Sequence, residues 1–281
     1  MSVFVRKEAY TGSVKAIVLD WAGTAVDYGC MGPAAVFVDV FKEQGIEVTV
    51  HEARQFMGIE KKEHIRQMCS LESVSKAWQD KFGSLPGEPD IDKLYDRTAD
   101  MMVAAIANHS DPIPGVLETI GQIRAMGIKI GSCTGYVQEM MDVLVPAAKE
   151  KGYAPDAIFC SSDAPAGRPY PWMCYLNAIE LGVYPMEAMV KIGDTIADIE
   201  EGLNAGMWTI GIVKTGNEMG LTRQDLEALD STDREARINE ITQRFEAAGA
   251  HYVLEQTADV VPVIEAINER LATGEQPLGV A

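Results

Sequence analysis

The fold of this chain is decided by the stretch Val14-Lys15-Ala16-Ile17-Val18-Leu19-Asp20-Trp21-Ala22-Gly23-Thr24, in which an apolar run leads directly into a carboxylate and a glycine turn. The β-branched pair Ile17 and Val18 is typical of a buried strand, and Asp20 is the first acidic side chain beyond it. Open parallel sheets bind their ligands at the carboxyl ends of their strands. Asp20 is therefore predicted to lie where a nucleophile would stand.

Short β-rich runs of this kind recur along the chain, and helical patterns lie between most of them. They cover residues 15–20, 128–133, 156–160, 189–193 and 208–213. Strands that alternate with helices pack as a parallel sheet with helices on both faces. The predicted fold class is a doubly wound parallel α/β sheet.

One long interval breaks this alternation. From about Gly32 to His109 the sequence shows only helical periodicity, interrupted by glycine and proline. A helical cap inserted after the first strand explains the interval, so we expect an α/β core of residues 1–28 and 108–281 and a cap domain of residues 29–107. Hinges are expected at both crossings, the second at the proline-rich segment 112–115.

The charge balance limits the classes of partner. The 281 residues include 24 Lys and Arg against 42 Asp and Glu, a formal net charge of −18. Such a chain repels polyphosphate backbones and anionic lipid, so neither nucleic acid nor a membrane surface is expected as a partner. An anionic substrate would need a site that is locally positive.

The cysteines and the termini suggest a location. The five cysteines form no C-x-x-C pair and are odd in number, so neither a disulfide framework nor a zinc site is predicted. Residues 1–13 contain no apolar leader segment, and no later run approaches the length of a membrane span. We expect a cytoplasmic protein.

Four separated segments each place a functional group just after a predicted strand. These groups are Asp20, Thr134, Arg168, and Asp194 with Asp198. Because parallel strands end at the same edge of a sheet, the four groups are expected to converge there. Taken singly, each has an ordinary interpretation, such as a helix cap or a solvated loop residue. Their occurrence together in this order favours a site.

The types of these groups indicate phosphoryl chemistry. Asp20 and Asp194 are hard oxygen ligands suited to Mg²⁺. Thr134 can donate a hydrogen bond to a phosphoryl oxygen, and Arg168 offers a permanent charge with several donors. Attack by Asp20 on phosphorus would give an aspartyl phosphate.

The order of these motifs resembles the haloacid dehalogenase superfamily of phosphoryl-transfer enzymes, in which a helical cap is also inserted. The motifs are DxxGT at Asp20, a strand-end Thr, a basic residue before proline, and GDxxxD from Gly193 to Asp198. Most phosphatases of that superfamily carry DxDxT, whose second Asp protonates an oxygen leaving group. Here Ala22 takes that position and can offer a metal only its backbone carbonyl. Ordinary ester hydrolysis would therefore lack its proton donor.

Longer strings are similar to a narrower family, the phosphonoacetaldehyde hydrolases or phosphonatases, over almost the whole chain. They are DWAGTAVDYGC from Asp20, MGIEKKEH from Met57, GSCTGY from Gly131, AGRPYPWMCY from Ala166 and KIGDTIADIEEGLNAGMW from Lys191. The resemblance implies hydrolysis of the P–C bond of phosphonoacetaldehyde to acetaldehyde and phosphate. It also implies Mg²⁺ on Asp20, Asp194 and the Ala22 carbonyl, with Asp198 supporting these ligands.

The same resemblance assigns Lys61 as the cap lysine that forms a Schiff base with the substrate aldehyde. An iminium draws in the electrons of a breaking P–C bond, so carbon can leave without an acid at position 22. The amine must be partly neutral, which nearby cations or desolvation would favour. A helix starting near Gly58 would place Met57, Lys61 and His64 on one face. Without the other motifs, Lys61 would be interpreted as a solvated helix lysine.

The supporting residues are expected to surround these groups. His64 is a candidate for moving protons during imine formation or enamine protonation. Gly135, Met57, Cys30 and Tyr136 are expected to line the pocket, although each is equally compatible with plain packing. The family resemblance further implies a homodimer formed through the cap.

Other functions remain open at this stage. A C–halogen hydrolase or a phosphomonoester hydrolase of the same superfamily would share the fold, and chloride release without Mg²⁺ would support the former. A catalytically silent protein that binds small molecules is a third alternative. The group that activates water against an aspartyl phosphate is not visible in the sequence.

Overall fold

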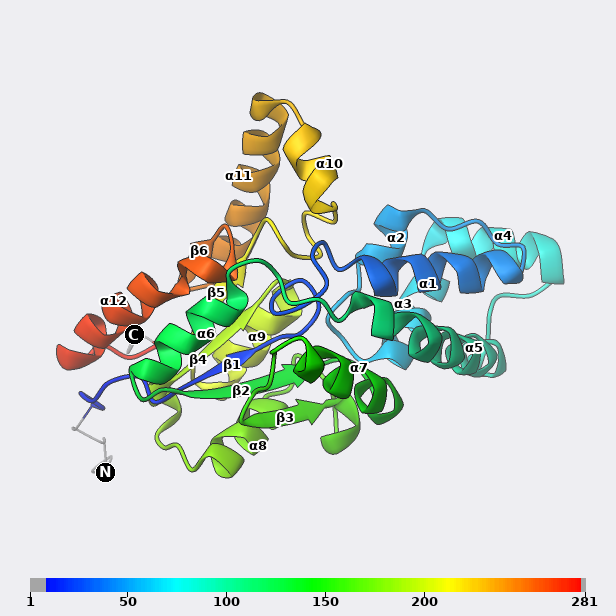
Figure 1. Ribbon diagram of the computed structural model, residues 1–281. Helices are drawn as coiled ribbons and strands as arrows, with labels where there is room; N and C mark the ends of the chain where they lie inside the picture. Colours follow the sequence, from blue (N-terminus) through cyan, green and yellow to red (C-terminus); the bar gives the residue numbers. More distant parts are fainter. Residues whose placement is uncertain (1–8, 279–281) are drawn as a thin grey trace, which may run out of the picture.

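The computed structural model describes residues 9–278 and is built on one six-stranded sheet (Figure 1). The strand order is β3-β2-β1-β4-β5-β6, and every neighbouring pair is parallel. The strands are β1 Ala16–Leu19, β2 Lys129–Thr134, β3 Ala157–Cys160, β4 Met189–Gly193, β5 Trp208–Ile212 and β6 Tyr252–Leu254. The predicted doubly wound α/β class is confirmed. The strand order reverses between β1 and β4, which creates the crevice where such sheets bind ligands.

Five of the six strands lie where the apolar runs predicted them. The sixth, β6, was not predicted. It contains only three half-buried residues at the edge of the sheet, so it is too short to show an alternating pattern.

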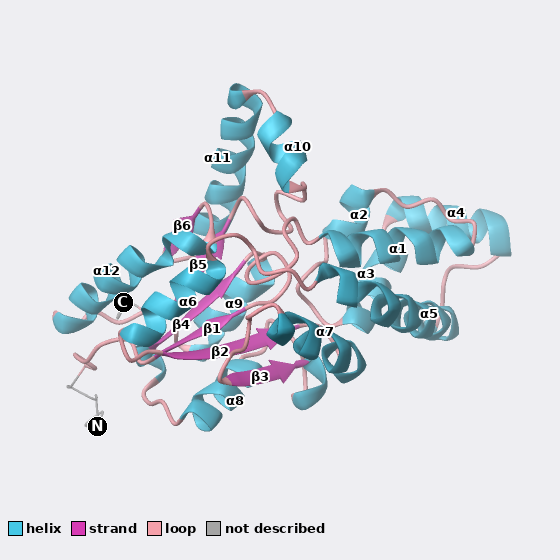
Figure 2. Ribbon diagram, in the orientation of Figure 1, coloured by secondary structure: helices cyan, strands magenta, loops and turns pink. Residues whose placement is uncertain are grey.

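Helices cover both faces of the sheet (Figure 2). Successive side chains of a strand point to opposite faces. Ile17 and Leu19 of β1 accordingly join the cluster under α6, α7 and α12, whereas Ala16 and Val18 join the cluster under α8 and α9. These helices are α6 Val116–Ala125, α7 Gln138–Glu150, α8 Trp172–Leu181, α9 Ile196–Ala205 and α12 Val260–Ala272. Burial on both faces makes β1 the central strand of the core.

The first five helices after β1 lie beyond the carboxyl ends of the strands (Figure 1). They are α1 Met31–Glu43, α2 Val50–Arg54, α3 Lys61–Ser70, α4 Glu72–Phe82 and α5 Glu88–Ile106. We call residues 31–106 the cap. Its apolar residues, such as Phe37 and Leu94, are continuous with the larger core cluster.

The two crossings between core and cap are tied together by Asp27. Its carboxylate accepts hydrogen bonds from the backbone N–H groups of Met31 at 3.3 Å and Gly32 at 3.1 Å, at the start of α1. The same carboxylate lies 3.0 Å from Nδ1 of His109, which belongs to the return crossing. The two crossings between core and cap are therefore in direct contact.

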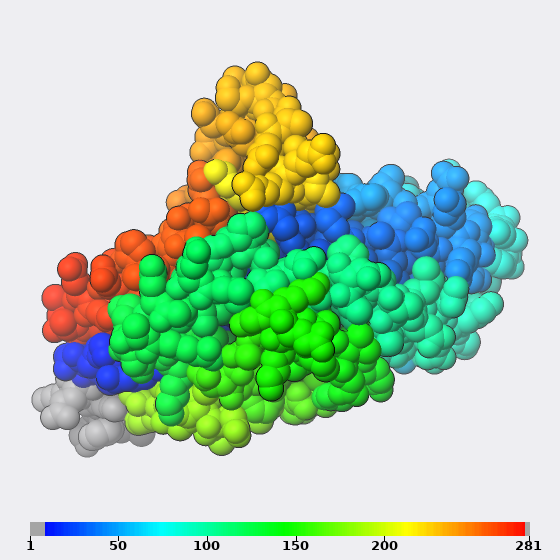
Figure 3. All heavy atoms as spheres, in the orientation of Figure 1, coloured from blue at the N-terminus to red at the C-terminus, as the bar shows by residue number. Residues whose placement is uncertain are grey.

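Two further helices form an arm that projects from the sheet (Figure 3). They are α10 Arg223–Ala228 and α11 Ser231–Ala247, and their buried side chains Leu226, Ile241 and Phe245 pack in one apolar cluster with core residues such as Ile199. Across the described part of the chain, no helix combines the length and apolar character that crossing a lipid bilayer requires.

Candidate active site

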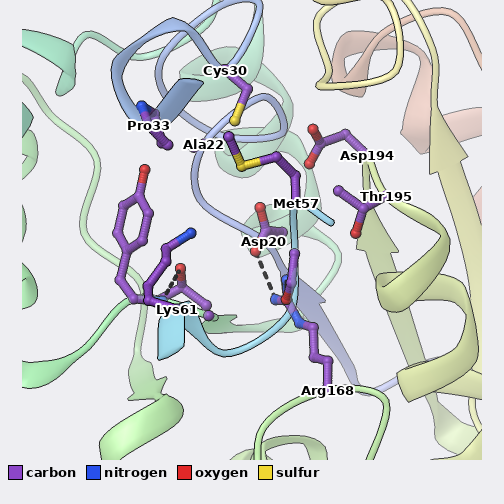
Figure 4. Close-up of a pocket in the computed structure, with 13 residues that line it drawn as sticks. Asp20, Ala22, Cys30, Pro33, Met57, Lys61, Arg168, Asp194 and Thr195 are labelled. Carbon is purple, nitrogen blue, oxygen red and sulfur yellow. Dashed lines mark hydrogen bonds and ion pairs between the residues drawn. The ribbon is translucent and has the colours of Figure 1, made fainter. Parts of the chain in front are cut away.

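A pocket lies at the carboxyl ends of the strands, between core and cap (Figure 4). It is lined by Asp20, Ala22, Cys30, Pro33, Met57, Gly58, Lys61, Thr134, Gly135, Tyr136, Arg168, Asp194 and Thr195. All the predicted site residues except His64 and Asp198 are among them. The four strand-end segments therefore converge.

Asp20 occupies the first position after β1. Its N–H donates to the carbonyl of Ile192 at 2.9 Å, which holds the residue between β1 and β4. Its Oδ1 accepts a hydrogen bond of 2.6 Å from the Arg168 guanidinium. Burial raises the pKa of the Asp20 carboxyl, and the positive charge of Arg168 opposes that shift. Its second oxygen, Oδ2, makes no hydrogen bond within residues 9–278.

Asp194 follows β4, across the crevice from Asp20. Its Oδ1 accepts a hydrogen bond from the Thr24 hydroxyl at 3.0 Å, and its Oδ2 accepts one from the Asn217 backbone N–H at 2.7 Å. Burial raises its pKa well above the usual range, and the charges of Asp20 and Asp198 raise it further. Two buried carboxylates this close would be stabilised in their charged form by a cation.

The donor set fits a divalent cation with a preference for oxygen. Ligand atoms of Asp20, Asp194 and Asp198 all lie within 4.8 Å of one another. Ala22 lines the same pocket, and among the described residues no donor reaches its backbone carbonyl. Carboxylates together with a backbone carbonyl are the hard oxygen ligands that Mg²⁺ takes in proteins.

Asp198 lies behind the pocket wall, where it contacts the residues next to Asp20 and Asp194 and does not line the pocket. Its Oδ1 accepts a hydrogen bond of 2.6 Å from Lys191 and lies 3.0 Å from the Arg168 guanidinium. Its Oδ2 accepts hydrogen bonds from the Thr195 hydroxyl at 2.6 Å and from the Thr195 N–H at 3.2 Å. Burial alone would raise the pKa of Asp198, but the cations Arg168 and Lys191 lower it. Both oxygens are thus occupied within the protein.

Arg168 is held by three carboxylates. Its guanidinium donates to Asp20, lies 3.0 Å from Asp198, and donates to Glu201 through Nε at 2.9 Å. It also donates to the Cys133 carbonyl at 2.9 Å. The side chain is 1% exposed, and its fixed charge is balanced by these carboxylates. An anionic substrate would therefore need a bound cation in addition to Arg168.

Sequence reasoning missed two members of this network, Lys191 and Glu201. Lys191 lies within β4 and is fully buried, with its amine 2.6 Å from Asp198 and 3.4 Å from Glu201. Glu201 follows Asp198 by three residues on α9, a spacing that places the two on one helix face. That spacing was the signal available for Glu201.

Lys61 enters the pocket from the first position of α3. The residue is only 2% exposed, and its amine lies 5.0 Å from the ring centre of Tyr136 and 5.6 Å from that of Phe37. Burial lowers the pKa of the amine to about 8, although Cys30 and Asp20 oppose the shift. The positive end of the α3 dipole also disfavours an ammonium there.

The neighbouring Lys62 has a different environment. Its amine lies 2.5 Å from the Asp92 carboxylate, and its side chain is 36% exposed. The hydrogen bond to Asp92 raises the pKa of Lys62. Of the two adjacent lysines, only Lys61 faces the pocket with a lowered pKa.

The prediction that a helix begins near Gly58 is wrong. Helix α3 begins at Lys61, because the Glu60 carboxylate accepts hydrogen bonds of 2.9 Å from the N–H groups of Lys62 and Glu63 and so caps the helix. Met57 therefore reaches the pocket from the loop before α3, and it does not share a helix face with Lys61.

His64 is fully buried beside Lys61 but does not line the pocket. Its ring stacks on Phe37 with centroids 3.9 Å apart, and Nε2 lies 2.9 Å from the Ala53 carbonyl. Burial lowers its pKa well below the usual range, and the charge of Lys61 contributes. A carbonyl partner requires the proton on Nε2, and the lowered pKa keeps the ring neutral, so Nδ1 carries no proton. Its proton-transfer role stays a prediction.

The loop before α3 packs tightly onto the core. Gly58 has a φ of 93°, and a Cβ at this position would overlap the hydroxyl of Thr195. A Cβ on Gly135 would lie 2.8 Å from the Ile59 carbonyl oxygen. Arg168 also donates to the Gly58 carbonyl at 3.4 Å. Glycine at both positions allows this approach, and the structure shows the cap closed over the pocket.

The remaining lining residues complete the pocket wall. The Thr134 oxygen accepts a hydrogen bond from the Tyr136 N–H at 3.2 Å, which leaves the hydroxyl proton available to a ligand. Burial raises the pKa of the Cys30 thiol and of the Tyr136 phenol well above their usual ranges. Both side chains are therefore neutral donors at neutral pH.

Comparisons with known proteins agree with this geometry. A haloacid dehalogenase-like hydrolase model matches residues 14–206. A phosphonoacetaldehyde hydrolase-like protein of Syntrophobacter fumaroxidans is 55% identical over 99% of this chain and all of its own length. A phosphonoacetaldehyde hydrolase of Nitratidesulfovibrio vulgaris is 52% identical over 99% of each chain. The crystal structure of a phosphonoacetaldehyde hydrolase-like protein from Oleispira antarctica superposes with a TM-score of 0.95 at 43% identity, covering 98% of this chain and 100% of the other.

Proposed function

The chain belongs to the haloacid dehalogenase-like hydrolases, and from that premise we propose that it hydrolyses the C–P bond of phosphonoacetaldehyde to give acetaldehyde and inorganic phosphate. One observation carries the proposal. A buried lysine with a lowered pKa, Lys61, shares a closed pocket with the strand-end carboxylate Asp20. The relatives named for this activity match the chain over nearly its whole length.

The first half of the reaction activates the carbon. The neutral Lys61 amine attacks the aldehyde carbon, and uptake of one proton from solvent with loss of water gives a protonated imine between the lysine and the substrate. The phosphonate group then lies beside Asp20, Arg168 and Thr134. The closed loop at Gly58 excludes bulk water from this step.

The second half transfers the phosphoryl group. A carboxylate oxygen of Asp20 forms a bond to phosphorus, the P–C bond breaks, and its electron pair enters the imine to give an enamine. Protonation of the enamine carbon and hydrolysis of the resulting imine release acetaldehyde and free Lys61. A second water cleaves the aspartyl phosphate to phosphate and Asp20.

The groups around the phosphonate stabilise the negative charge that the phosphoryl group carries while it moves to Asp20. The Thr134 hydroxyl donates to a phosphoryl oxygen, and the fixed charge of Arg168 beside Asp20 attracts the negative charge that the phosphoryl oxygens hold during transfer. Asp20, Asp194 and the Ala22 carbonyl would hold Mg²⁺, which supplies charge neutralisation between the nucleophile and the phosphoryl group. Ala22 leaves no acid for an oxygen leaving group, which disfavours phosphate esters as substrates.

The rate of imine formation is expected to rise with pH and to level off above about pH 8, the lowered pKa of the Lys61 amine. Below that value the amine is protonated and is no nucleophile, so the rate falls about tenfold per pH unit. Borohydride trapping of the imine over a pH series measures this midpoint. A midpoint above pH 10, as for an exposed lysine, would contradict the assigned environment.

Phosphate release from phosphonoacetaldehyde is expected to stop when a chelator removes divalent cations and to return when Mg²⁺ is added in excess. The physical reason is that burial raises the pKa values of both the Asp20 and the Asp194 carboxyl, so their charged forms need a cation. The assay is a continuous measurement of inorganic phosphate. Full turnover in chelator would argue against the metal, and chloride release from haloacids without Mg²⁺ would favour a dehalogenase.

We also propose that the protein is a cytoplasmic homodimer. A reducing location is supported by its five cysteines, all of which are buried and free of disulfides. The cap exposes the apolar side chains Phe82 and Leu85, which are 48% and 59% exposed. Analytical ultracentrifugation gives the oligomeric state directly.

A further inference from the structure

A cross-connection between cap and core lies beside the pocket, outside the groups used so far. Arg54 is the last residue of α2 in the cap, and Asn217 lies in the core loop after β5. The Arg54 guanidinium donates to the Asn217 Oδ1 at 3.1 Å. In return, the Asn217 Nδ2 donates to the Arg54 carbonyl at 3.1 Å. The two residues thus hold each other by both side chain and backbone.

Asn217 also touches the proposed metal ligand. Its backbone N–H donates to the Asp194 Oδ2 at 2.7 Å. The preceding Gly216 packs so closely on Asp194 that a Cβ at position 216 would overlap that side chain. Asn217 is 3% exposed, so a shift of its side chain cannot be absorbed by solvent and must move the loop that carries this N–H.

The Arg54 guanidinium is held next to Asn217 by the residues that pack around it. Its second terminal nitrogen lies 3.3 Å from the Met31 sulfur, and a Cβ on Gly220 would approach its Nε to 2.9 Å. Nε is buried and has no hydrogen-bond partner among the described residues. Asn217 therefore supplies the side-chain oxygen that holds this guanidinium when the cap is closed.

We propose that Asn217 is a positioning residue through which closure of the cap, by way of Arg54, orients the metal ligand Asp194. The inference rests on the proposed function, since Asp194 is assigned there to the metal. Opening of the cap breaks the contact with Arg54 and frees the loop that fixes Asp194. Because coupling between two equilibria is reciprocal, Mg²⁺ on Asp194 must favour the closed cap as much as closure favours Mg²⁺.

The test uses Arg54→Met, Asn217→Ala and the double variant, with Mg²⁺ alone as the probe. Neither change removes a proposed metal ligand or the backbone N–H of residue 217. Each single variant is expected to weaken Mg²⁺ binding about tenfold by isothermal titration calorimetry, a typical size for such coupling. The double variant is expected to bind Mg²⁺ about as weakly as either single one, because both remove the same contact.

Hydrogen exchange provides a readout of closure without turnover. In the natural protein, Mg²⁺ is expected to slow exchange of the amides of residues 55–61, and in the variants this protection is expected to be lost. Arg97→Met is the matched control, since Arg97 pairs with Glu43 on the outer cap surface and is 46% exposed. Its Mg²⁺ affinity and protection should be unchanged. Circular dichroism checks folding, and Asn217→Ala carries the test alone if Arg54→Met does not fold.

The outcomes separate this inference from the proposed function. Mg²⁺ affinity within about twofold of the natural protein in both single variants would overturn the coupling, and so would roughly multiplicative losses in the double variant. Weaker Mg²⁺ binding and loss of Mg²⁺-dependent amide protection in the variants would support the role of Asn217, even if the natural protein does not turn over phosphonoacetaldehyde. If the natural protein binds no Mg²⁺, both the role of Asn217 and the metal site of the proposed function are wrong.

Discussion

Replacement of Lys61 by arginine is expected to lower the rate of phosphate release from phosphonoacetaldehyde by roughly 10⁴- to 10⁶-fold, the range for loss of a covalent catalytic group. Arginine keeps the positive charge in the pocket, but its guanidinium stays protonated and forms no imine. The electrons of the P–C bond then have no acceptor. The measurement is phosphate release under saturating Mg²⁺ and substrate.

The adjacent lysine provides the matched control for this change. Lys62 is paired with Asp92 at the surface, so Lys62→Arg should leave the rate within about twofold, as is usual for an exposed pair. Lys61→Met tests whether folding is responsible, because it removes a buried charge and should not lower the thermal midpoint. A Lys61→Arg protein with a tenth of the normal rate would refute the imine.

Replacement of Asp20 by asparagine is expected to reduce phosphate release on the same scale, roughly 10⁴- to 10⁶-fold. The amide retains an oxygen that can accept the hydrogen bond from Arg168, so the pocket is kept, but it is no nucleophile toward phosphorus. The imine should still form at Lys61, because that step precedes P–C cleavage. Phosphate release and borohydride trapping are measured on the same preparation.

This combination of results distinguishes the two covalent steps. Asp156→Asn is the control, since Asp156 pairs with Arg124 at the surface and is 42% exposed. Its phosphate release should match that of the natural protein. If Asp20→Asn lost imine trapping together with phosphate release, Asp20 would be needed to form the imine and the proposed order of steps would fail.

The sheet and its active edge could be predicted because their signals are local. The apolar run before Asp20 and the run before Asp194 each contain enough β-branched residues to mark a strand, and parallel strands end at one edge. Strand β6 gave no such signal, since its three residues at the sheet edge are only half-buried. Its place depends on pairing with β5 and not on its own sequence.

The start of α3 shows how one capping residue changes a site prediction. Periodicity alone extends a helix back to Gly58, but the Glu60 carboxylate satisfies the first free N–H groups and fixes the start at Lys61. Lys61 is thereby placed at the positive end of the helix, where an ammonium is disfavoured. The resemblance identified the lysine, and the local structure explains its pKa.

The residues that sequence reasoning missed act through burial or through the backbone. Lys191 appeared as one polar residue in an apolar strand, and only the packed structure places it against Asp198 and Glu201. Asn217 reaches Asp194 through its N–H, and a backbone donor leaves no mark on residue type. The burial of His64 likewise depends on which face of α3 packs on Phe37.

The central claim is that Lys61 carries the substrate carbon while Asp20 receives the phosphoryl group. Its most direct test is to incubate the protein with phosphonoacetaldehyde, reduce with borohydride, and locate the adduct by peptide mass spectrometry. We predict a single reduced adduct on Lys61, absent from Lys61→Arg and present in Asp20→Asn. An adduct on Lys62, or no adduct while phosphate is being released, would contradict this mechanism.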